Sequence, residues 1–222
     1  MTRYRRPARS RRWLVPVVLV AAVLLLALWR FLPQRYYSAR QLGIEQLQSP
    51  CDADGDGLED WMDMVTGARA YIATDPHYKS KYYAGGYPDD GQGVCTDVIW
   101  QAFRAAGYEL KTLVDTDVAR NREAYPFIEV QDTNIDFRRV NTLDTFLRRH
   151  AQVLSNDFAD PAQWQPGDIV VFGDCAHIAI CSDRRNRQGI PFIIHHGNPI
   201  DEAVERNEIY DLPVTGHFRW VG

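Results

Sequence analysis

Apolar residues recur at helical intervals in three segments of the chain. Between Leu58 and Ile72 they are spaced three or four residues apart, which predicts an amphipathic helix. The segment from Cys95 to Ala106 has the same spacing, and Gly107 behind it is a residue that commonly ends helices. A shorter helix is predicted from Thr142 to His150. Residues 82–93, rich in glycine, proline, aspartate and tyrosine, predict a loop.

Short runs of apolar and β-branched residues dominate the last part of the chain. They predict strands over residues 168–172, 178–182, 191–196 and 216–221. Helices therefore come first and a meander of strands second, an order typical of an α+β fold. A length of 222 residues allows one core-bearing domain, and no internal repeat is visible.

An uncharged apolar run occupies residues 13–29 and continues to residue 32 after a single arginine. A bilayer-spanning helix needs about 20 apolar residues, within a range of about 17–25. Six arginines precede the run, and cytoplasmic flanks of membrane helices are rich in basic residues. We therefore expect a cytoplasmic basic segment at 1–12, an uncleaved transmembrane signal anchor at 13–32 and a tether at 33–50 containing one helical turn. The alternative is a cleaved signal peptide, including one of the twin-arginine type.

Charge is distributed unevenly along the chain. Residues 1–30 hold seven of the 25 basic residues and no acidic residue, which leaves 18 basic against 29 acidic side chains in the remainder. A body with this excess of negative charge, and with no basic stripe bearing interleaved aromatic residues, does not favour nucleic acid as a partner. The anchor places this body outside the cytoplasm, at the cell membrane on the periplasmic or cell-wall side.

An acidic loop precedes the first predicted helix. Asp52, Asp54, Asp56 and Asp60 stand at positions 1, 3, 5 and 9 of a calcium-loop pattern, with Gly57 at position 6 and Asp63 at position 12. Alternating carboxylates can surround a Ca²⁺ ion, and the glycine permits the sharp turn between them. We expect residues 51–63 to bind a structural Ca²⁺ ion; the alternative is a solvated acidic turn that caps the helix.

Four cysteines, Cys51, Cys95, Cys175 and Cys181, lie in the predicted extracytoplasmic body, where disulfides are permitted. Cys175 and Cys181 flank one predicted strand about 20 Å long, which is too far for a mutual disulfide. Cys51 could pair with either of them. The spacing is not that of a zinc site.

Cys95 is the candidate nucleophile. It stands in the predicted first turn of a helix, where the helix dipole and unpaired backbone N–H groups favour a thiolate. Asp89, Asp90, Gly91 and Gly93 form a turn of small residues before it that would allow a substrate to approach the backbone. The alternative is that Cys95 has a structural role at the helix start and does not react.

Histidines on two predicted strands could complete a catalytic triad. A cysteine hydrolase needs an imidazole near the sulfur and a third polar group that fixes the imidazole tautomer. His177 begins one strand and is the candidate base. His195 ends the next strand and is the expected third group, although a shift of one residue in register would put His196 there instead.

Five segments carry a family resemblance: Gly93–Ile99, Asn134–Val140, Gly167–Val170, His177–Ile180 and Gly216–Arg219. Together they resemble the DUF1287 branch of the NlpC/P60 superfamily of papain-like cell-wall hydrolases. The resemblance implies a catalytic domain over residues 64–222, in which a nucleophile helix packs on a small antiparallel sheet that bears the histidines. The sequence differs from the better-studied members in two ways: it has Val94-Cys95-Thr96-Asp97 at the candidate nucleophile, and an extended turn is expected at Arg184–Gly189.

The resemblance implies cleavage of an amide bond in peptidoglycan stem peptides, with no cofactor for catalysis. The alternatives are acyl transfer or an amidase reaction on another substrate, and a non-catalytic wall-binding module stabilised by calcium. If the protein is a hydrolase, an oxyanion could be stabilised by the Cys95 backbone N–H and by Tyr82, Tyr83 or Tyr87. Alternatively, these tyrosines could only pack the loop. Arg138 and Arg139 could bind substrate carboxylates, or could pair with Asp136 or face solvent. His217 is expected to be structural.

Overall fold

The computed structural model describes residues 15–22, 34–197 and 202–222. The chain divides into two units, Met1–Arg35 and Tyr36–Gly222. In the first unit residues 15–22 are helical, and the rest of the predicted anchor and basic segment lies outside the described residues. Among the residues that are described, no helix combines the length and the apolar character needed to cross a bilayer.

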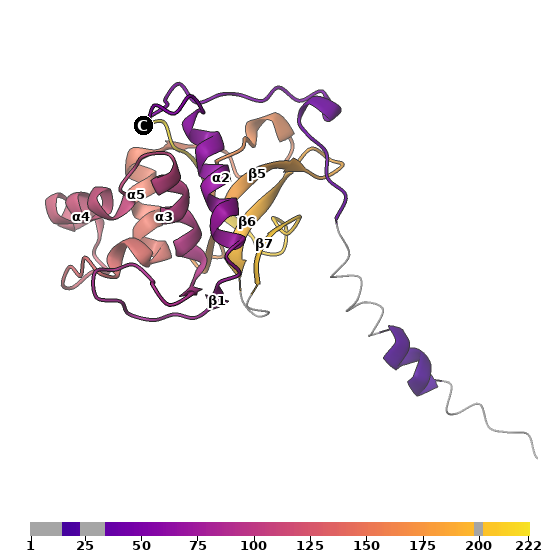
Figure 1. Ribbon diagram of the computed structural model, residues 1–222, viewed down its shortest axis with the longest axis horizontal. Coiled ribbons are helices and arrows are strands. Elements are labelled where there is room, and N and C mark those ends of the chain that lie inside the picture. The colour runs from indigo at the N-terminus through magenta and orange to yellow at the C-terminus, as the bar shows by residue number, and fades with distance from the viewer. Residues whose placement is uncertain (1–14, 23–33, 198–201) are drawn as a thin grey trace, which may run out of the picture. The chain divides into compact units, whose positions relative to one another are not determined.

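The second unit is a mixed α+β structure built on a six-stranded antiparallel sheet (Figure 1). Its strands, in spatial order, are β3 (Gln152–Val153), β8 (Val214–Arg219), β4 (Ile169–Phe172), β5 (His177–Arg185), β6 (Pro191–Gly197) and β7 (Glu202–Arg206). A small parallel pair joins β1 (His77–Tyr78) to β2 (Gln92–Gly93). The predicted α+β class and the four predicted strands are confirmed, although β5 is longer than expected.

Four longer helices accompany the sheet: α2 (Asp60–Ile72), α3 (Cys95–Ala105), α4 (Leu110–Arg120) and α5 (Val140–His150). The short 3-10 turns are η2 (Arg40–Leu42), η3 (Arg122–Ala124), η4 (Asp136–Arg138) and η5 (Pro161–Gln163). The three helices expected from apolar spacing are confirmed. Helix α4 was not predicted, because only Leu110, Val114 and Val118 carry its buried apolar stripe between charged and threonine residues.

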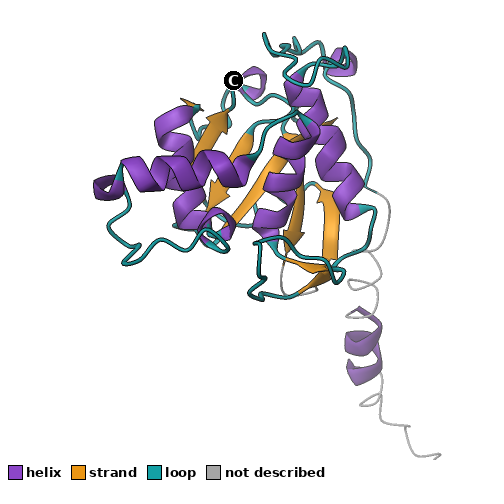
Figure 2. Ribbon diagram, turned by 60° about the vertical axis from the view of Figure 1, so that its left-hand side comes forward, coloured by secondary structure: helices purple, strands orange, loops and turns teal. Residues whose placement is uncertain are grey.

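The helices gather on one face of the sheet, where α2 and α3 pack against β5 and β6 (Figure 2). Alternate residues of the central strands face opposite sides. Ile178 and Ile180 contact the helical core, whereas Ala179 and Cys181 join a second core around Trp164 on the other face. Burial on both faces explains why the central strands read as continuous apolar runs rather than as alternating patterns.

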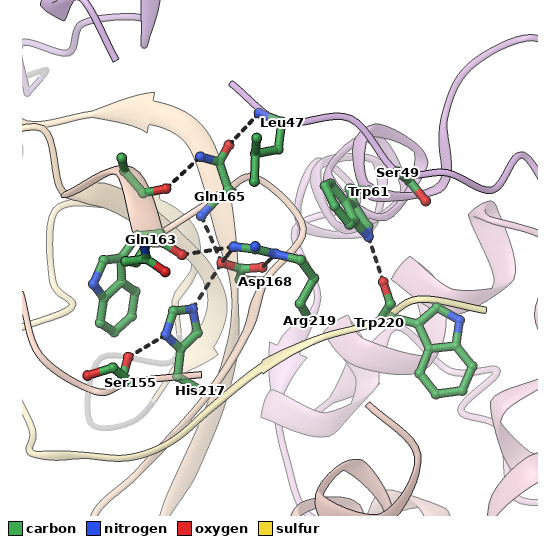
Figure 3. A network of polar contacts seen from close by, with 12 residues as sticks. Leu47, Ser49, Trp61, Ser155, Gln163, Gln165, Asp168, His217, Arg219 and Trp220 are labelled. Atoms are coloured by element: carbon green, nitrogen blue, oxygen red, sulfur yellow. Dashed lines mark hydrogen bonds and ion pairs between the residues drawn. The ribbon is translucent and has the colours of Figure 1, made fainter. Parts of the chain in front are cut away.

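The segment expected to be a free tether packs on the body from residue 36 onwards. Tyr37 exchanges two backbone hydrogen bonds with Arg185, of 2.9 and 2.8 Å. Gln165 holds the segment further along, where it accepts from the backbone N–H of Leu47 at 3.0 Å (Figure 3). Its amide nitrogen also donates to the carbonyl of Glu45 at 3.0 Å. The expected helical turn is present as η2, but residues 36–50 belong to the compact unit.

All four cysteines are free thiols. Cys181 is fully buried in the second core, and the Sγ atom of Cys51 lies 3.5 Å from the carbonyl oxygen of Val221. The turn expected at Arg184–Gly189 is shorter than predicted, since both arginines 184 and 185 still belong to β5.

Candidate active site

Cys95 is the first residue of α3 and is buried, with an exposed fraction of 6%. Asp97, two residues on, fixes the start of the helix. Its Oδ2 atom accepts a hydrogen bond of 2.7 Å from the backbone N–H of Val94, and Oδ1 accepts one of 2.7 Å from the indole of Trp100. The carboxylate thus satisfies an orphan donor at the helix N-terminus and holds the backbone next to Cys95 in place.

A buried bidentate ion pair joins this helix start to the η4 turn. The guanidinium of Arg138 contacts Asp97 through Nε at 2.7 Å and Nη2 at 2.8 Å, and both side chains are almost fully buried. The expectation that Arg138 binds a substrate carboxylate is therefore wrong, because Asp97 already occupies its fork. Arg139 does pair with Asp136, at 3.3 Å, and its side chain remains half exposed.

The three candidate tyrosines have different surroundings. Tyr87 bonds Glu109 and packs on Trp100, so its role is in packing of the loop. Tyr83 is buried and donates to Asp90 at 2.8 Å. Tyr82 is 55% exposed, with its hydroxyl 2.9 Å from the Asn134 amide nitrogen. Each phenol oxygen already has a partner, and within the described part of the chain none of the three hydroxyls is hydrogen-bonded to Cys95.

Burial raises the pKa of the Cys95 thiol to about 11, and the charge of Asp97 adds to the rise. Hydrogen bonds from the backbone N–H groups of Ile178, Thr96 and Cys95 itself favour the thiolate, as expected at a helix start, but they only partly offset the effect of burial. Burial therefore opposes the thiolate that the helix start favours. Within the described residues no hydrogen bond joins the Sγ atom to a ring nitrogen of His177.

The candidate base directly precedes Ile178 in β5, and Ile178 donates its backbone N–H to the Cys95 sulfur. The His177 ring itself lies 5.9 Å from the ring of Phe172, a member of the second core. Burial, followed by the neighbouring His195, lowers the pKa of His177 to about 3. The resting pair is thus a neutral thiol and a neutral imidazole. In this state the imidazole can accept a proton, but no ion pair has formed in advance.

His177 and His195 are joined directly, since Nε2 of His177 lies 2.9 Å from Nδ1 of His195. The pairing of Ile180 with Ile194 explains the contact: it puts both histidines on one face of the sheet in diagonal positions. His196 points to the opposite face, where its Nδ1 atom lies 3.0 Å from the hydroxyl of Tyr71. Of the two alternatives for the third group, the structure brings His195 to the base.

Glu208 extends this pair into a chain of three side chains. Its Oε2 atom lies 3.1 Å from Nε2 of His195. A carboxylate accepts, so His195 carries its proton on Nε2 and its Nδ1 accepts from Nε2–H of His177. The Nδ1 atom of His177 is then the unprotonated one, as a general base requires; this tautomer is assigned from the hydrogen-bond network.

Sequence reasoning missed Glu208. It follows β7, an edge strand whose sequence Glu-Ala-Val-Glu-Arg has too few apolar residues to signal a strand. The antiparallel pairing of β6 with β7 returns the chain to His195, which is opposite Val204. Gly197 leaves room for the relay, since a Cβ atom there would lie 3.0 Å from Nδ1 of His195.

Tyr71 was also missed. Its pKa is raised by burial and then by the charges of Asp97 and, less strongly, Cys95, so its hydroxyl lies in the same electrostatic neighbourhood as the thiol. A Cβ atom at Gly93 would lie only 2.1 Å from this hydroxyl. The Tyr71 hydroxyl therefore leaves no space for a side chain at position 93.

A second buried network explains two of the segments that carried the family resemblance (Figure 3). Asp168 accepts from Nε2 of His217 at 2.9 Å and from Arg219 at 2.7 and 2.8 Å. The His217 ring also stacks on Trp164, with 3.9 Å between ring centroids. His217 is structural, as expected, and fastens β8 to the start of β4.

The acidic loop brings together part of the expected metal set. Ligand oxygens of Asp52, Asp54 and Asp56 all lie within 4.8 Å of one another. Asp60 is not part of this group: its side chain is buried, and its two oxygens accept from the backbone N–H of Ala53 at 2.8 Å and from the hydroxyl of Tyr108 at 2.6 Å. Asp63 is buried and lies outside this group of three: burial raises its pKa to about 6, and the carboxylates of the loop add to the rise.

Comparison with known proteins places the chain. Residues 65–220 match the family described as "Domain of unknown function (DUF1287)". The chain is also similar to "Uncharacterized protein YijF" of Escherichia coli (strain K12), with 35% identity over 167 residues that cover 71% of this chain and 80% of that protein. No solved structure matches the chain. Residues 65–220 include α3 and the side chains of His177, His195 and Glu208 but not the acidic loop, and the chain belongs to the DUF1287 family.

Proposed function

We propose that this protein is a cysteine hydrolase of the NlpC/P60, papain-like type, which cleaves an amide bond in peptidoglycan stem peptides. The observation that carries the proposal is the relay Glu208–His195–His177. Its last member, His177, directly precedes Ile178, whose backbone N–H donates to the Cys95 sulfur. A relay of this kind fixes the tautomer of a general base, and a structural histidine pair has no need of it.

In the proposed reaction, Nδ1 of His177 takes the proton of the Cys95 thiol as the sulfur attacks the amide carbonyl. The backbone N–H groups of Cys95 and Thr96, at the start of α3, are the donors we propose for the oxyanion. His177 then donates the proton to the leaving amine, which leaves a thioester on Cys95. Water, deprotonated by the same imidazole, releases the acid and restores the thiol.

We place the domain outside the cytoplasm, tied to the cell membrane through the apolar segment at residues 13–32. The support is the sequence of that segment and its arginine flank. Peptidoglycan lies on that side of the membrane, so location and substrate agree. The half-exposed Arg139 is the residue we propose for binding a carboxylate of the stem peptide, since Arg138 is committed to Asp97.

One observation favours a second candidate, a wall-binding module in which Cys95 does not react. The thiol is buried, has a raised pKa and has no hydrogen bond to His177 among the described residues. Hydrolysis requires that substrate binding bring the Cys95 thiol and the His177 imidazole together. A wall-binding module requires no such contact.

Product analysis separates these functions. The protein is incubated with purified peptidoglycan, and the soluble products are analysed by mass spectrometry with and without an added primary amine. Fragments with new amino and carboxyl termini support hydrolysis, and fragments carrying the amine support acyl transfer by the same nucleophile. Binding to peptidoglycan without either product would leave the wall-binding module and overturn the proposed hydrolase.

A further inference from the structure

We propose that the acidic loop binds one Ca²⁺ ion through Asp52, Asp54, Asp56 and Asp63, and that the ion fastens the loop to the far end of the nucleophile helix. The site is separate from the hydrolase chemistry: α3 has 11 residues, so its two ends are about 16 Å apart.

The loop is shaped as a cation loop by its own backbone. Asp52 accepts from the N–H groups of Gly55 at 2.8 Å and Gly57 at 3.1 Å, and both glycines have positive φ angles. These bonds turn the chain so that oxygens of Asp52, Asp54 and Asp56 lie within 4.8 Å of one another. Oxygens this close can share one Ca²⁺ ion at about 2.4 Å from each.

The independent observation is the state of Asp63. Its side chain is only 5% exposed, and its Oδ2 atom is buried without a hydrogen-bond partner. Asp63 follows the loop in the first turn of α2, close enough that the charges of the loop carboxylates add to the effect of burial on its pKa. A buried carboxylate oxygen without a donor, close to other carboxylates, is unfavourable unless a cation neutralises the charge. Ca²⁺ supplies that charge and accepts carboxylate oxygens in flexible geometry.

The loop contacts parts of the fold that are distant in sequence. A Cβ atom on Gly107, just after α3, would lie 3.0 Å from the Cβ atom of Asp54, and Tyr108 donates to Asp60. Trp61, which follows Asp60 in the first turn of α2, donates its indole N–H to the carbonyl of Trp220 at 2.6 Å (Figure 3). Closing the loop with Ca²⁺ therefore ties α2 and the C-terminal segment to the end of α3.

The test is thermal unfolding of the full-length protein after chelation, with Ca²⁺ added back. At a hundredfold excess over Kd we expect Tm to rise by about 5 °C or more. Asp54→Asn should abolish this rise, while the matched control Glu129→Gln, at an exposed acid on another loop, should retain it. No rise in the wild-type protein, or an equal rise in Asp54→Asn, would overturn the proposal.

Asp63→Asn gives a second test of opposite sign. Without Ca²⁺ the variant should melt at a higher temperature than the wild type, because the unpaired buried charge is gone, and with Ca²⁺ it should gain little. A lower Tm without Ca²⁺ would mean that Asp63 is an ordinary structural partner and would contradict the site. Peptide release by folded protein should be the same with and without Ca²⁺, so failure of this proposal leaves the proposed hydrolase intact.

Discussion

The Nε2 atom of His177 lies 2.9 Å from Nδ1 of His195, and the remaining nitrogen of His195 lies 3.1 Å from Glu208. This order of contacts fixes which nitrogen carries each proton. It leaves Nδ1 of His177 as the acceptor, the form that a base for Cys95 needs.

Glu208→Gln should lower kcat about 10- to 100-fold with little change in KM, as is typical when the partner of a functional histidine is lost. Glu208 acts to raise the pKa of His177, so its loss should also shift the acid limb of the activity profile to lower pH. A purely structural role would not move that limb. Glu129→Gln serves as the control, and unchanged kcat in Glu208→Gln would argue against the relay.

Gly197→Ala should reduce kcat while the protein stays folded. The added Cβ atom would lie 3.0 Å from both Cε1 and Nδ1 of His195, so the ring must turn away from His177. The backbone of Gly197 has no positive φ angle, and alanine is therefore tolerated by the chain itself. Steady-state kinetics and a melting curve on the same sample check this, and full activity would show that the ring is not held as described.

Arg138→Met should lower the free energy of unfolding by about 3–5 kcal/mol, because it leaves the Asp97 carboxylate buried without its cation. Urea denaturation measures the loss. Arg148→Ala is the matched control, since its ion pair with Asp144 is half exposed and such pairs contribute about 0–1 kcal/mol. A stable Arg138→Met protein with a raised KM would instead return Arg138 to substrate binding.

Alkylation of Cys95 by iodoacetamide should accelerate about tenfold per pH unit from pH 6 to pH 10. The thiolate is the reacting species, and burial raises the pKa of this thiol to about 11, so the thiolate fraction grows throughout that range. Peptide mass spectrometry distinguishes Cys95 from the other three cysteines. A rate that is already constant from pH 6 upwards would reveal a resting thiolate and contradict the neutral pair.

The sequence predicts the helices and central strands well, because apolar spacing is a local property. Helix α4 and strand β7 were not predicted, because both are rich in polar residues and depend on tertiary contacts rather than on a local apolar pattern. Cys95, His177 and His195 could be named from residue type, order and resemblance. The choice of His195 over His196 needed the register of β5 and β6.

Partners distant in the chain could not be predicted. Arg138 and Asp97 are 41 residues apart, and nothing local distinguishes an arginine that binds a buried carboxylate from one that awaits a substrate. The same holds for Glu208, which reaches His195 only through the β6–β7 pairing. The protonation state of Cys95 could not be predicted from sequence either. The argument from the helix terminus did not include the cost of burying a thiolate, which raises the pKa of the thiol.

The most direct test of the central claim compares the rates at which three proteins release stem-peptide fragments from purified peptidoglycan: the wild type, Cys95→Ser and Cys175→Ser. Cys175 is a partly exposed thiol outside the relay and serves as the matched control. We expect release by the wild type and by Cys175→Ser, and none by Cys95→Ser, with closely similar melting temperatures for all three. Equal release by Cys95→Ser would contradict the assignment of Cys95 as the nucleophile.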